Sequence, residues 1–372
     1  MKRAFAIFLA SIFLGIYSCS KSDSDTSATN GSQNTMNDLV RGGFTISPLD
    51  SMDITALVPL GNLNPPGHVF PTDHMYFYCY TNKAYLDIKS PGNIHVIKID
   101  RTHYNAGLVN DHYDYSISLG SDNSYMYWNH VSKLSARLLL EANNFTSAKF
   151  DPTYASGGST FEQCHLKTYL TVSTGEILGT ANSTKGLACM DIGTAVIGVS
   201  TNPLEYFDAN SRNMLENKLG RFDGKVKRTA LPICGEIIQD ITATAQGNWL
   251  KQGLPKNPED NHIALVKDNI DSSKQAFSVG VSIPGLPSNV YYFNPQSSGF
   301  TNRHFAEVKP DGNTYCYTLG ILNFPFPGNS LIPSTSVIIK MENGTTLSVE
   351  KRNCDCTCAP YTFTSNKATF TR

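Results

Sequence analysis

Met75-Tyr76-Phe77-Tyr78-Cys79-Tyr80 is almost wholly aromatic and apolar, and runs of this kind decide the fold class of the chain. Aromatic and β-branched residues favour the pleated, half-buried surface of a β-strand. Similar short runs lie on its C-terminal side, whereas helix-favouring charged runs are scarce. The clearest are Ile94–Ile99, Tyr113–Leu119 and Ser336–Lys340, with turns at Pro91-Gly92-Asn93 and Glu342-Asn343-Gly344-Thr345. The sequence therefore predicts a mainly β fold with few short helices.

Two segments carry helix-start signals. Ser132 can cap a short helix that runs through Leu140. Pro203 precedes a second predicted helix over Leu204–Leu219, which Gly220 ends. The chain is too long for one ordinary core, so two domains are expected. We predict a β domain over residues 44–200, a helical linker over 201–231 and an all-β domain over 232–372.

The N-terminus has the features of an export signal. Lys2 and Arg3 precede the apolar run Ala4–Ile16, which is shorter than the ~20 residues that a membrane-spanning helix needs. The sequence around Cys19 resembles a bacterial lipoprotein signal, in which residues 1–18 are removed and the cysteine is lipidated. That resemblance implies a protein anchored in the bacterial cell envelope through lipid at Cys19, on its periplasmic or cell-surface face. Residues 19–43 are mostly polar and are expected to form a disordered tether.

Charge and cysteine content narrow the class of partner and the compartment. Without the two basic residues of the signal, 28 basic residues face 31 acidic ones, a net charge of −3. No basic stripe is present, so a nucleic-acid partner is not expected. Outside the cytoplasm the other eight cysteines can form disulfides, in any of 105 full pairings. If Cys354, Cys356 and Cys358 lay in a strand, they would share one face, and we favour disulfide or free-thiol use there over metal binding.

The loop before the aromatic run offers groups that can do chemistry. Prolines and glycines between Pro59 and Pro71 restrict its backbone, and His68, Asp73 and His74 follow within a few residues of each other. Imidazole and carboxylate are the groups that bind a catalytic zinc ion, usually three from the protein. The alternative is a rigid structural loop whose histidines bond to backbone. Adjacent residues such as Asp73 and His74 would also point to opposite sides of a strand.

The order of several motifs resembles the M23, or lysostaphin-like, metallopeptidase family over about residues 58–198. The family has a His and an Asp four residues apart before a strand, then Tyr-x-His, then a glycine turn. Here Tyr127–Leu134 is similar to the second motif, with one extra residue before His130, and Val172–Gly179 is similar to the third. The resemblance implies a compact β-barrel-like fold, zinc-dependent cleavage of peptidoglycan, and for His130 a role in assisting the bound water or the transition state.

The departures from that family pattern weigh against catalysis. The family ends on His-x-His, whereas Leu187–Gly193 contains no histidine, so Cys189 or Asp191 would have to replace a ligand. His68 and Asp73 are also five residues apart instead of four. We therefore expect a degenerate M23-like domain, without cofactor, that binds peptidoglycan or an envelope partner through its groove. The alternatives are a zinc metallohydrolase with ligands from His68, Asp73, His74 and Asp191, assisted by His130, and a structural surface lipoprotein.

Overall fold

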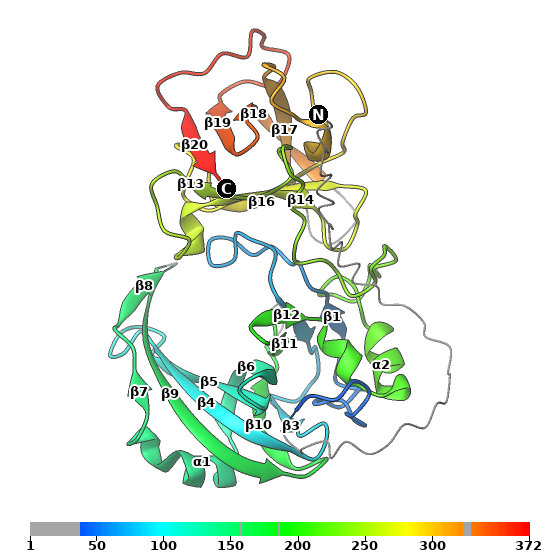
Figure 1. Ribbon diagram of the computed structural model, residues 1–372, viewed down its shortest axis with the longest axis vertical. Coiled ribbons are helices and arrows are strands. Elements are labelled where there is room, and N and C mark those ends of the chain that lie inside the picture. The colour runs from blue at the N-terminus through cyan, green and yellow to red at the C-terminus, as the bar shows by residue number, and fades with distance from the viewer. Residues whose placement is uncertain (1–37, 157, 185–186, 323–328) are drawn as a thin grey trace, which may run out of the picture.

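The computed structural model describes residues 38–156, 158–184, 187–322 and 329–372 (Figure 1). The predicted signal peptide (1–18), the lipidation at Cys19 and the tether up to residue 37 lie outside these residues. The described chain forms a large sheet followed by a separate closed barrel, which confirms the mainly β prediction. In the described part of the chain, no helix is long and apolar enough to cross a bilayer.

The first half of the chain forms a twelve-stranded sheet, and its paired strands are antiparallel. Its main path runs in the order β1 (Ala56–Val58), β2 (His74–Tyr78), β11 (Met190–Val196), β6 (Ser124–Leu134), β5 (His112–Gly120), β4 (Ile94–Tyr104), β9 (Ser159–Val172) and β7 (Lys149–Phe150). Four strands pair off this path: β3 (Tyr85–Lys89), β8 (Tyr154–Ser156), β10 (Ile177–Asn182) and β12 (Val199–Thr201). The long strands β4, β5 and β9 curve together in Figure 1.

One face of these long strands is apolar. Ile99, Ile117 and Trp128 are fully buried in the main core, which also contains Leu138 and Phe145. Leu138 belongs to helix α1 (Ala136–Ala142), and Phe145 ends the short 3-10 helix η1 (Asn143–Phe145) that follows it. Apolar burial on this face leaves the opposite face of the same strands for polar side chains, because successive residues alternate across a sheet.

The second half of the chain is a closed barrel of eight strands. They are β13 (Gly247–Lys251), β14 (Ile263–Lys267), β15 (Gln275–Val279), β16 (Asn289–Phe293), β17 (Tyr315–Leu322), β18 (Asn329–Asn343), β19 (Thr346–Arg352) and β20 (Ala368–Thr371). Closure comes from the pairing of β20 with β13. Trp249 is fully buried in the barrel core, and its indole N–H donates to the Ala245 carbonyl oxygen at 2.8 Å. The predicted turn between Glu342 and Thr345 joins β18 to β19.

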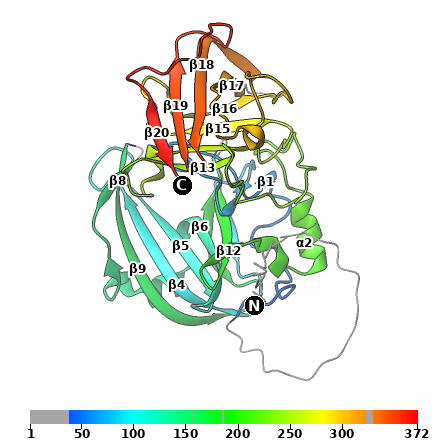
Figure 2. The ribbon, with the colours of Figure 1, turned by 45° about the horizontal axis from the view of Figure 1, so that its top comes forward.

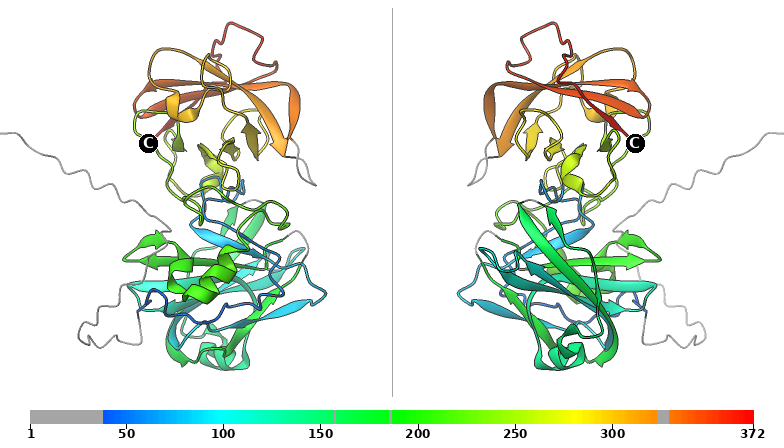
Figure 3. Two further views of the ribbon diagram at one scale, coloured as in Figure 1. Left: turned by 90° about the vertical axis from the view of Figure 1, so that its right-hand side faces the viewer. Right: turned by 90° about the vertical axis from the view of Figure 1, so that its left-hand side faces the viewer.

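The proline-rich loop lies between the sheet and the barrel, as the views in Figures 2 and 3 show. Val69 and Phe70 of this loop form a small core with barrel residues, among them Val266. The Phe70 ring stacks on His262, with 5.6 Å between the ring centroids. The Phe70 backbone N–H donates to the Glu259 carboxylate in the 3-10 helix η3 (Glu259–Asn261) at 3.2 Å. The barrel therefore helps to fix the loop that carries His68.

The predicted helix boundaries need correction. Ser132 does not cap a helix, because β6 continues to Leu134 and Ser135 accepts the capping hydrogen bond from the Leu138 N–H at 3.4 Å. The second predicted helix is two: η2 (Pro203–Tyr206) and α2 (Ala209–Glu216). Between them Phe207 is extended and forms a β-bridge with Phe44, so a contact with a distant segment breaks the helix. A last short helix, η4 (Phe305–Glu307), lies before β17.

Four of the cysteines form two disulfides. Cys79 pairs with Cys189, and Cys316 pairs with Cys356. The first bond ties the end of β2 to the start of β11. Cys354, Cys356 and Cys358 do not lie in a strand, because this segment turns after β19 ends, and Cys356 is the one of the three that is in a disulfide. Cys354 and Cys358 are free thiols there.

Candidate functional site

Three neighbouring strands bring residues from distant parts of the sequence to one point. Strands β2, β11 and β6 lie side by side and carry His74, Asp191 and His130. The Asp191 Oδ2 atom lies 3.5 Å from His74 Nε2 and 3.3 Å from His130 Nε2. Asp191 therefore stands between two imidazoles. We call His68, Asp73, His74, Asp114, His130 and Asp191 the histidine–carboxylate cluster.

Each of the two imidazoles also contacts a second carboxylate, through its Nδ1 atom. The His74 Nδ1 atom is 3.0 Å from Asp73 Oδ1, and His130 Nδ1 is 2.7 Å from Asp114 Oδ2. Each ring thus has its Nδ1 on one carboxylate and its Nε2 toward Asp191. Such a contact fixes the tautomer and the orientation of an imidazole. The sequence interpretation missed Asp114, and its place in an alternating strand gives only a weak signal for it.

Strand alternation predicted that Asp73 and His74 would point to opposite sides, but the Asp73 carboxylate contacts the His74 ring. Asp73 lies in a bend just before β2 begins, so its carboxylate can reach the ring of the next residue. Tyr127 Oη donates to Asp73 Oδ1 at 3.1 Å, and Ser200 Oγ donates to Asp73 Oδ2 at 2.9 Å. Gly193 faces Tyr127 across the strand pair, and a Cβ there would meet the tyrosine ring at 2.1 Å. A glycine at this position leaves room for that ring.

His130 reaches Asp191 from a β-bulge. Tyr115 pairs with Val131 and Ile117 pairs with Trp128, so β6 has one residue more than β5 at this point. The backbone φ of His130 is +64°, in the left-handed region, which costs a non-glycine residue about 1–2 kcal/mol. Bulges redirect side chains and are frequent beside functional sites.

His68 lies beside these residues on the proline-rich loop. Its ring is edge-on to His74, with 5.4 Å between the ring centroids. Two backbone hydrogen bonds between Asn64 and His68, of 2.8 and 3.0 Å, close the tight turn that holds it. Burial, together with the neighbouring His74, lowers the pKa of His68. His68 is therefore favoured as a neutral imidazole.

Charges within the cluster set the protonation of its other members. The hydrogen bond from His74 lowers the pKa of Asp73 to about 2. Burial alone would lower the pKa of His130, but Asp191 and Asp114 together raise it well above its usual value. His74 and Asp191 are nearly inaccessible, whereas the side chains of His130 and Asp73 are 45% and 47% exposed. The cluster is therefore open to solvent on the side of His130 and Asp73.

The predicted metal ligands are only partly brought together. Among the described residues, no group of three or more His, Cys, Asp or Glu side chains is arranged to hold a metal ion. Asp73 contacts His74, Tyr127 and Ser200 and not Asp191, so it orients a histidine. Cys189 is not a free thiolate ligand, because it is in the disulfide with Cys79. His74 Nε2 and Asp191 Oδ1 are nevertheless buried without a hydrogen-bond partner in the described structure.

A polar face extends from the cluster across strands β5, β4 and β9. Directly paired residues of antiparallel strands share a face, which places Asp114, Thr102 and Gln163 in one row. Gln163 Nε2 donates to Thr102 Oγ1 at 3.2 Å. The next row, at the edge of the sheet, consists of aromatic rings: His112, Tyr104, Phe161 and Tyr154. We refer to the row of Asp114, Thr102 and Gln163, together with this aromatic row, as the polar face.

The aromatic row is stacked in pairs. The Tyr104 ring lies parallel to that of His112 at a centroid distance of 4.7 Å, and the Phe161 ring lies parallel to that of Tyr154 at 4.9 Å. Tyr104 and Phe161 meet edge to face. Tyr154 is 46% exposed. These rings give the polar face an exposed, flat apolar end.

Comparisons of the chain with protein-family models, with curated proteins and with solved structures found no match. The resemblances to a lipoprotein signal and to the M23 family therefore stay predictions.

Proposed function

We propose that this chain is a lipid-anchored protein of the bacterial cell envelope that binds peptidoglycan without cleaving it. In this proposal lipid at Cys19 holds the chain at the membrane, and the polar face receives the polymer. The observation that carries the proposal is the continuity of the polar face with the histidine–carboxylate cluster, across strands β6, β5, β4 and β9. An extended polymer needs such an extended surface.

The chemistry of the polar face suits a polymer of sugars and peptides. Thr102 and Gln163 present hydroxyl and amide groups, which donate to and accept from the hydroxyls and amides of such a polymer. The half-exposed aromatic row offers flat rings to the apolar faces of sugars. A recognition surface of this kind combines apolar contact area with a few placed polar groups.

The two positions that would replace the zinc-binding histidines of the M23 pattern support binding of peptidoglycan over its cleavage. In the M23 pattern the final strand supplies His-x-His, and the similar positions here are Cys189 and Asp191. The first is in a disulfide, and the second lies between two imidazoles. The cluster is thus a hydrogen-bonded and ion-paired end of the binding surface in this proposal.

Co-sedimentation with purified peptidoglycan sacculi tests the proposal. The mature lipidated protein in detergent should sediment with the sacculi. Thr102→Ala combined with Gln163→Ala should weaken binding about tenfold, the effect of losing hydrogen bonds worth about 1.4 kcal/mol in all. Asn210→Ala, at an exposed position of α2, is the matched control and should bind normally. Absence of retention, or equal retention of all variants, would contradict the proposal.

A zinc metallohydrolase is the second candidate, and one specific observation favours it. Two histidines are oriented through Nδ1 by carboxylates, as metal-bound histidines commonly are, and Asp191 Oδ1 and His74 Nε2 lack hydrogen-bond partners. His68, His74 and Asp191 would hold the ion, with His130 beside it. A zinc ion there would polarise a carbonyl and activate water.

Metal analysis separates the two candidates. Zinc is measured in the purified mature protein and in its His68→Ala and His74→Ala variants. One zinc per chain that is lost in either variant would favour the hydrolase and contradict the non-catalytic proposal. A metal-free protein with an intact fold, after purification in the presence of zinc, would remove the hydrolase.

A further inference from the structure

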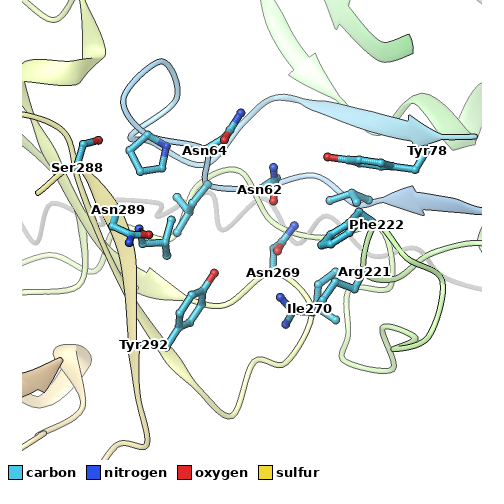
Figure 4. A pocket seen from close by; sticks show the side chains of 14 residues that line it. Asn62, Asn64, Tyr78, Arg221, Phe222, Asn269, Ile270, Ser288, Asn289 and Tyr292 are labelled. Atoms are coloured by element: carbon cyan, nitrogen blue, oxygen red, sulfur yellow. Dashed lines mark hydrogen bonds between the residues drawn. The ribbon is translucent and has the colours of Figure 1, made fainter. Parts of the chain in front are cut away.

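A pocket lies where the barrel meets the sheet, apart from the polar face. Its volume is about 390 Å³, within the range of pockets that hold small molecules. Figure 4 shows that its walls come from both halves of the chain. The proline-rich loop and β2 supply Asn62, Asn64 and Tyr78, the segment after α2 supplies Arg221 and Phe222, and the barrel supplies Asn269, Ser288, Asn289 and Tyr292. No role in the proposed function accounts for this pocket.

Amide side chains dominate its polar lining. Asn62 and Asn269 lie near the centre in Figure 4, and Asn289 lies beside Ser288 on the barrel side. An amide both donates and accepts, which is the pattern that a ligand hydroxyl also offers. The Ser288 Oγ atom is buried and has no hydrogen-bond partner in the described structure. A ligand group at this wall would bond to that hydroxyl once the Ser288 side chain turns toward the pocket.

Aromatic rings form the apolar part of the lining. Tyr78 and Phe222 lie at one end of the pocket in Figure 4, and Tyr292 lies at the other. Flat rings on two sides of a polar centre suit a ligand that has apolar ring faces and a polar rim. Asn269 Nδ2 donates to the Pro59 carbonyl oxygen at 3.3 Å, and Asn289 Oδ1 accepts the Val290 backbone N–H at 2.8 Å. The other polar atom of each amide is left for a ligand that carries hydrogen-bonding groups.

The charges around the pocket favour an uncharged ligand. Arg221 and Asp268 are both buried, and Arg221 Nη2 lies 3.6 Å from Asp268 Oδ1. That carboxylate oxygen also accepts the backbone N–H groups of Ile270 and Asp271, at 3.0 and 2.7 Å. The pocket is thus close to neutral overall. A ligand carboxylate that approached Arg221 would also approach Asp268, and like charges close together are unfavourable.

We propose that this pocket binds a neutral saccharide of one or two rings. Sugar hydroxyls match the asparagine amides and Ser288, and sugar ring faces match Tyr78, Phe222 and Tyr292. The inference does not rest on the proposed function, because no residue of the polar face or of the histidine–carboxylate cluster lines the pocket.

Ligand-observed NMR with saturation transfer, followed by calorimetry, tests the proposal on the mature full-length protein. The probes are N-acetylglucosamine, chitobiose, cellobiose and maltose, with triglycine, a zwitterion that carries a carboxylate and an ammonium group, as the comparison. At least one of the four sugars should bind, and triglycine should not. Asn62→Ala and Asn289→Ala should each weaken the binding of that sugar about tenfold. Asn210→Ala is the control and should bind as the parent does.

Ser288→Ala is the variant that guards against loss of folding, because it removes a hydroxyl that no described residue contacts by hydrogen bond. It should melt like the parent and still bind the sugar several-fold more weakly. Binding of none of the four sugars would overturn the proposal, as would unchanged binding in all three pocket variants. Binding of triglycine alone would replace the saccharide with a peptide ligand. Thr102→Ala with Gln163→Ala should leave the binding of a sugar in the pocket unchanged. Sugar binding that this double variant weakens and the pocket variants do not would place the sugar on the polar face and overturn the pocket proposal, so the two proposals fail separately.

Discussion

At the scale of single residues, Asp191 determines the properties of the cluster. It is nearly fully buried, and it lies within 3.5 Å of two imidazoles. The Nδ1 atom of each imidazole contacts another carboxylate. An isolated buried carboxylate would be costly, so its negative charge is stabilised by these rings. The protonation of His130 depends on this arrangement, since Asp191 and Asp114 both favour the imidazolium form.

Asp191→Asn should lower the pKa of His130. The substitution removes one of the two carboxylates that raise this pKa, while the burial that lowers it remains. A pH titration of the His130 ring resonances by NMR measures the change. Asp122→Asn, at an exposed ion pair with Lys167, is the control and should not move it. An unchanged pKa in Asp191→Asn would show that Asp191 does not contact His130 in solution.

Asp73 should make the fold sensitive to acid. Its pKa is about 2 in the folded chain against an ordinary 3.8, so the ionised form is favoured by folding. That contribution is present above pH ~4 and is lost as the pH falls toward 2. Denaturant unfolding at pH 6 and pH 3 should therefore show a smaller stability difference between the parent and Asp73→Asn at pH 3. An equal difference at the two pH values would contradict this account.

At the scale of elements, local chemistry explains most of what could be predicted. The strands around Tyr113–Leu119 and Ser336–Lys340 follow from alternation and β-favouring residues, and the turn before Thr345 follows from Asn343-Gly344. The break at Phe207 could not be predicted, because it depends on a bridge to distant Phe44. The sequence did not identify Asp114 as a site residue for a similar reason. Its role exists only once the register of β5 against the bulged β6 is known.

The bulge in β6 predicts an unusual order of stability among variants at position 130. Both His130→Ala and His130→Gly lose the contacts with Asp114 and Asp191, but only glycine adopts a φ of +64° without strain. His130→Gly should therefore be more stable than His130→Ala by about 1 kcal/mol. Denaturant unfolding of the two variants measures the difference. Greater stability of the alanine variant would contradict the left-handed conformation.

At the scale of the whole molecule, the proline-rich loop connects the two halves structurally. It carries His68 toward the cluster, inserts Val69 and Phe70 against the barrel, and lines the pocket with Asn62 and Asn64. Proline and glycine content predicted a fixed loop, but not what would pack on it. That depends on Ala264, Val266, Ala276 and Val290 from the barrel, which are far away in sequence.

Phe70→Ala should uncouple the barrel from the sheet. Phe70 is buried between them, and truncating a buried phenylalanine typically costs about 3–5 kcal/mol. Differential scanning calorimetry should show two separated unfolding transitions in the variant, and saccharide binding should be lost with the pocket. Phe300→Ala, at an exposed ring of the barrel, is the control. A single transition at the parent temperature would show that the loop does not couple the two halves.

The measurement that tests the central claim most directly is incubation of the mature protein with purified sacculi, followed by analysis of both the pellet and the supernatant. We expect the protein in the pellet and no muropeptides released into the supernatant, even with zinc added. Release of muropeptides that His74→Ala abolishes would contradict the proposed non-catalytic role. Protein that stays in the supernatant would contradict peptidoglycan binding itself.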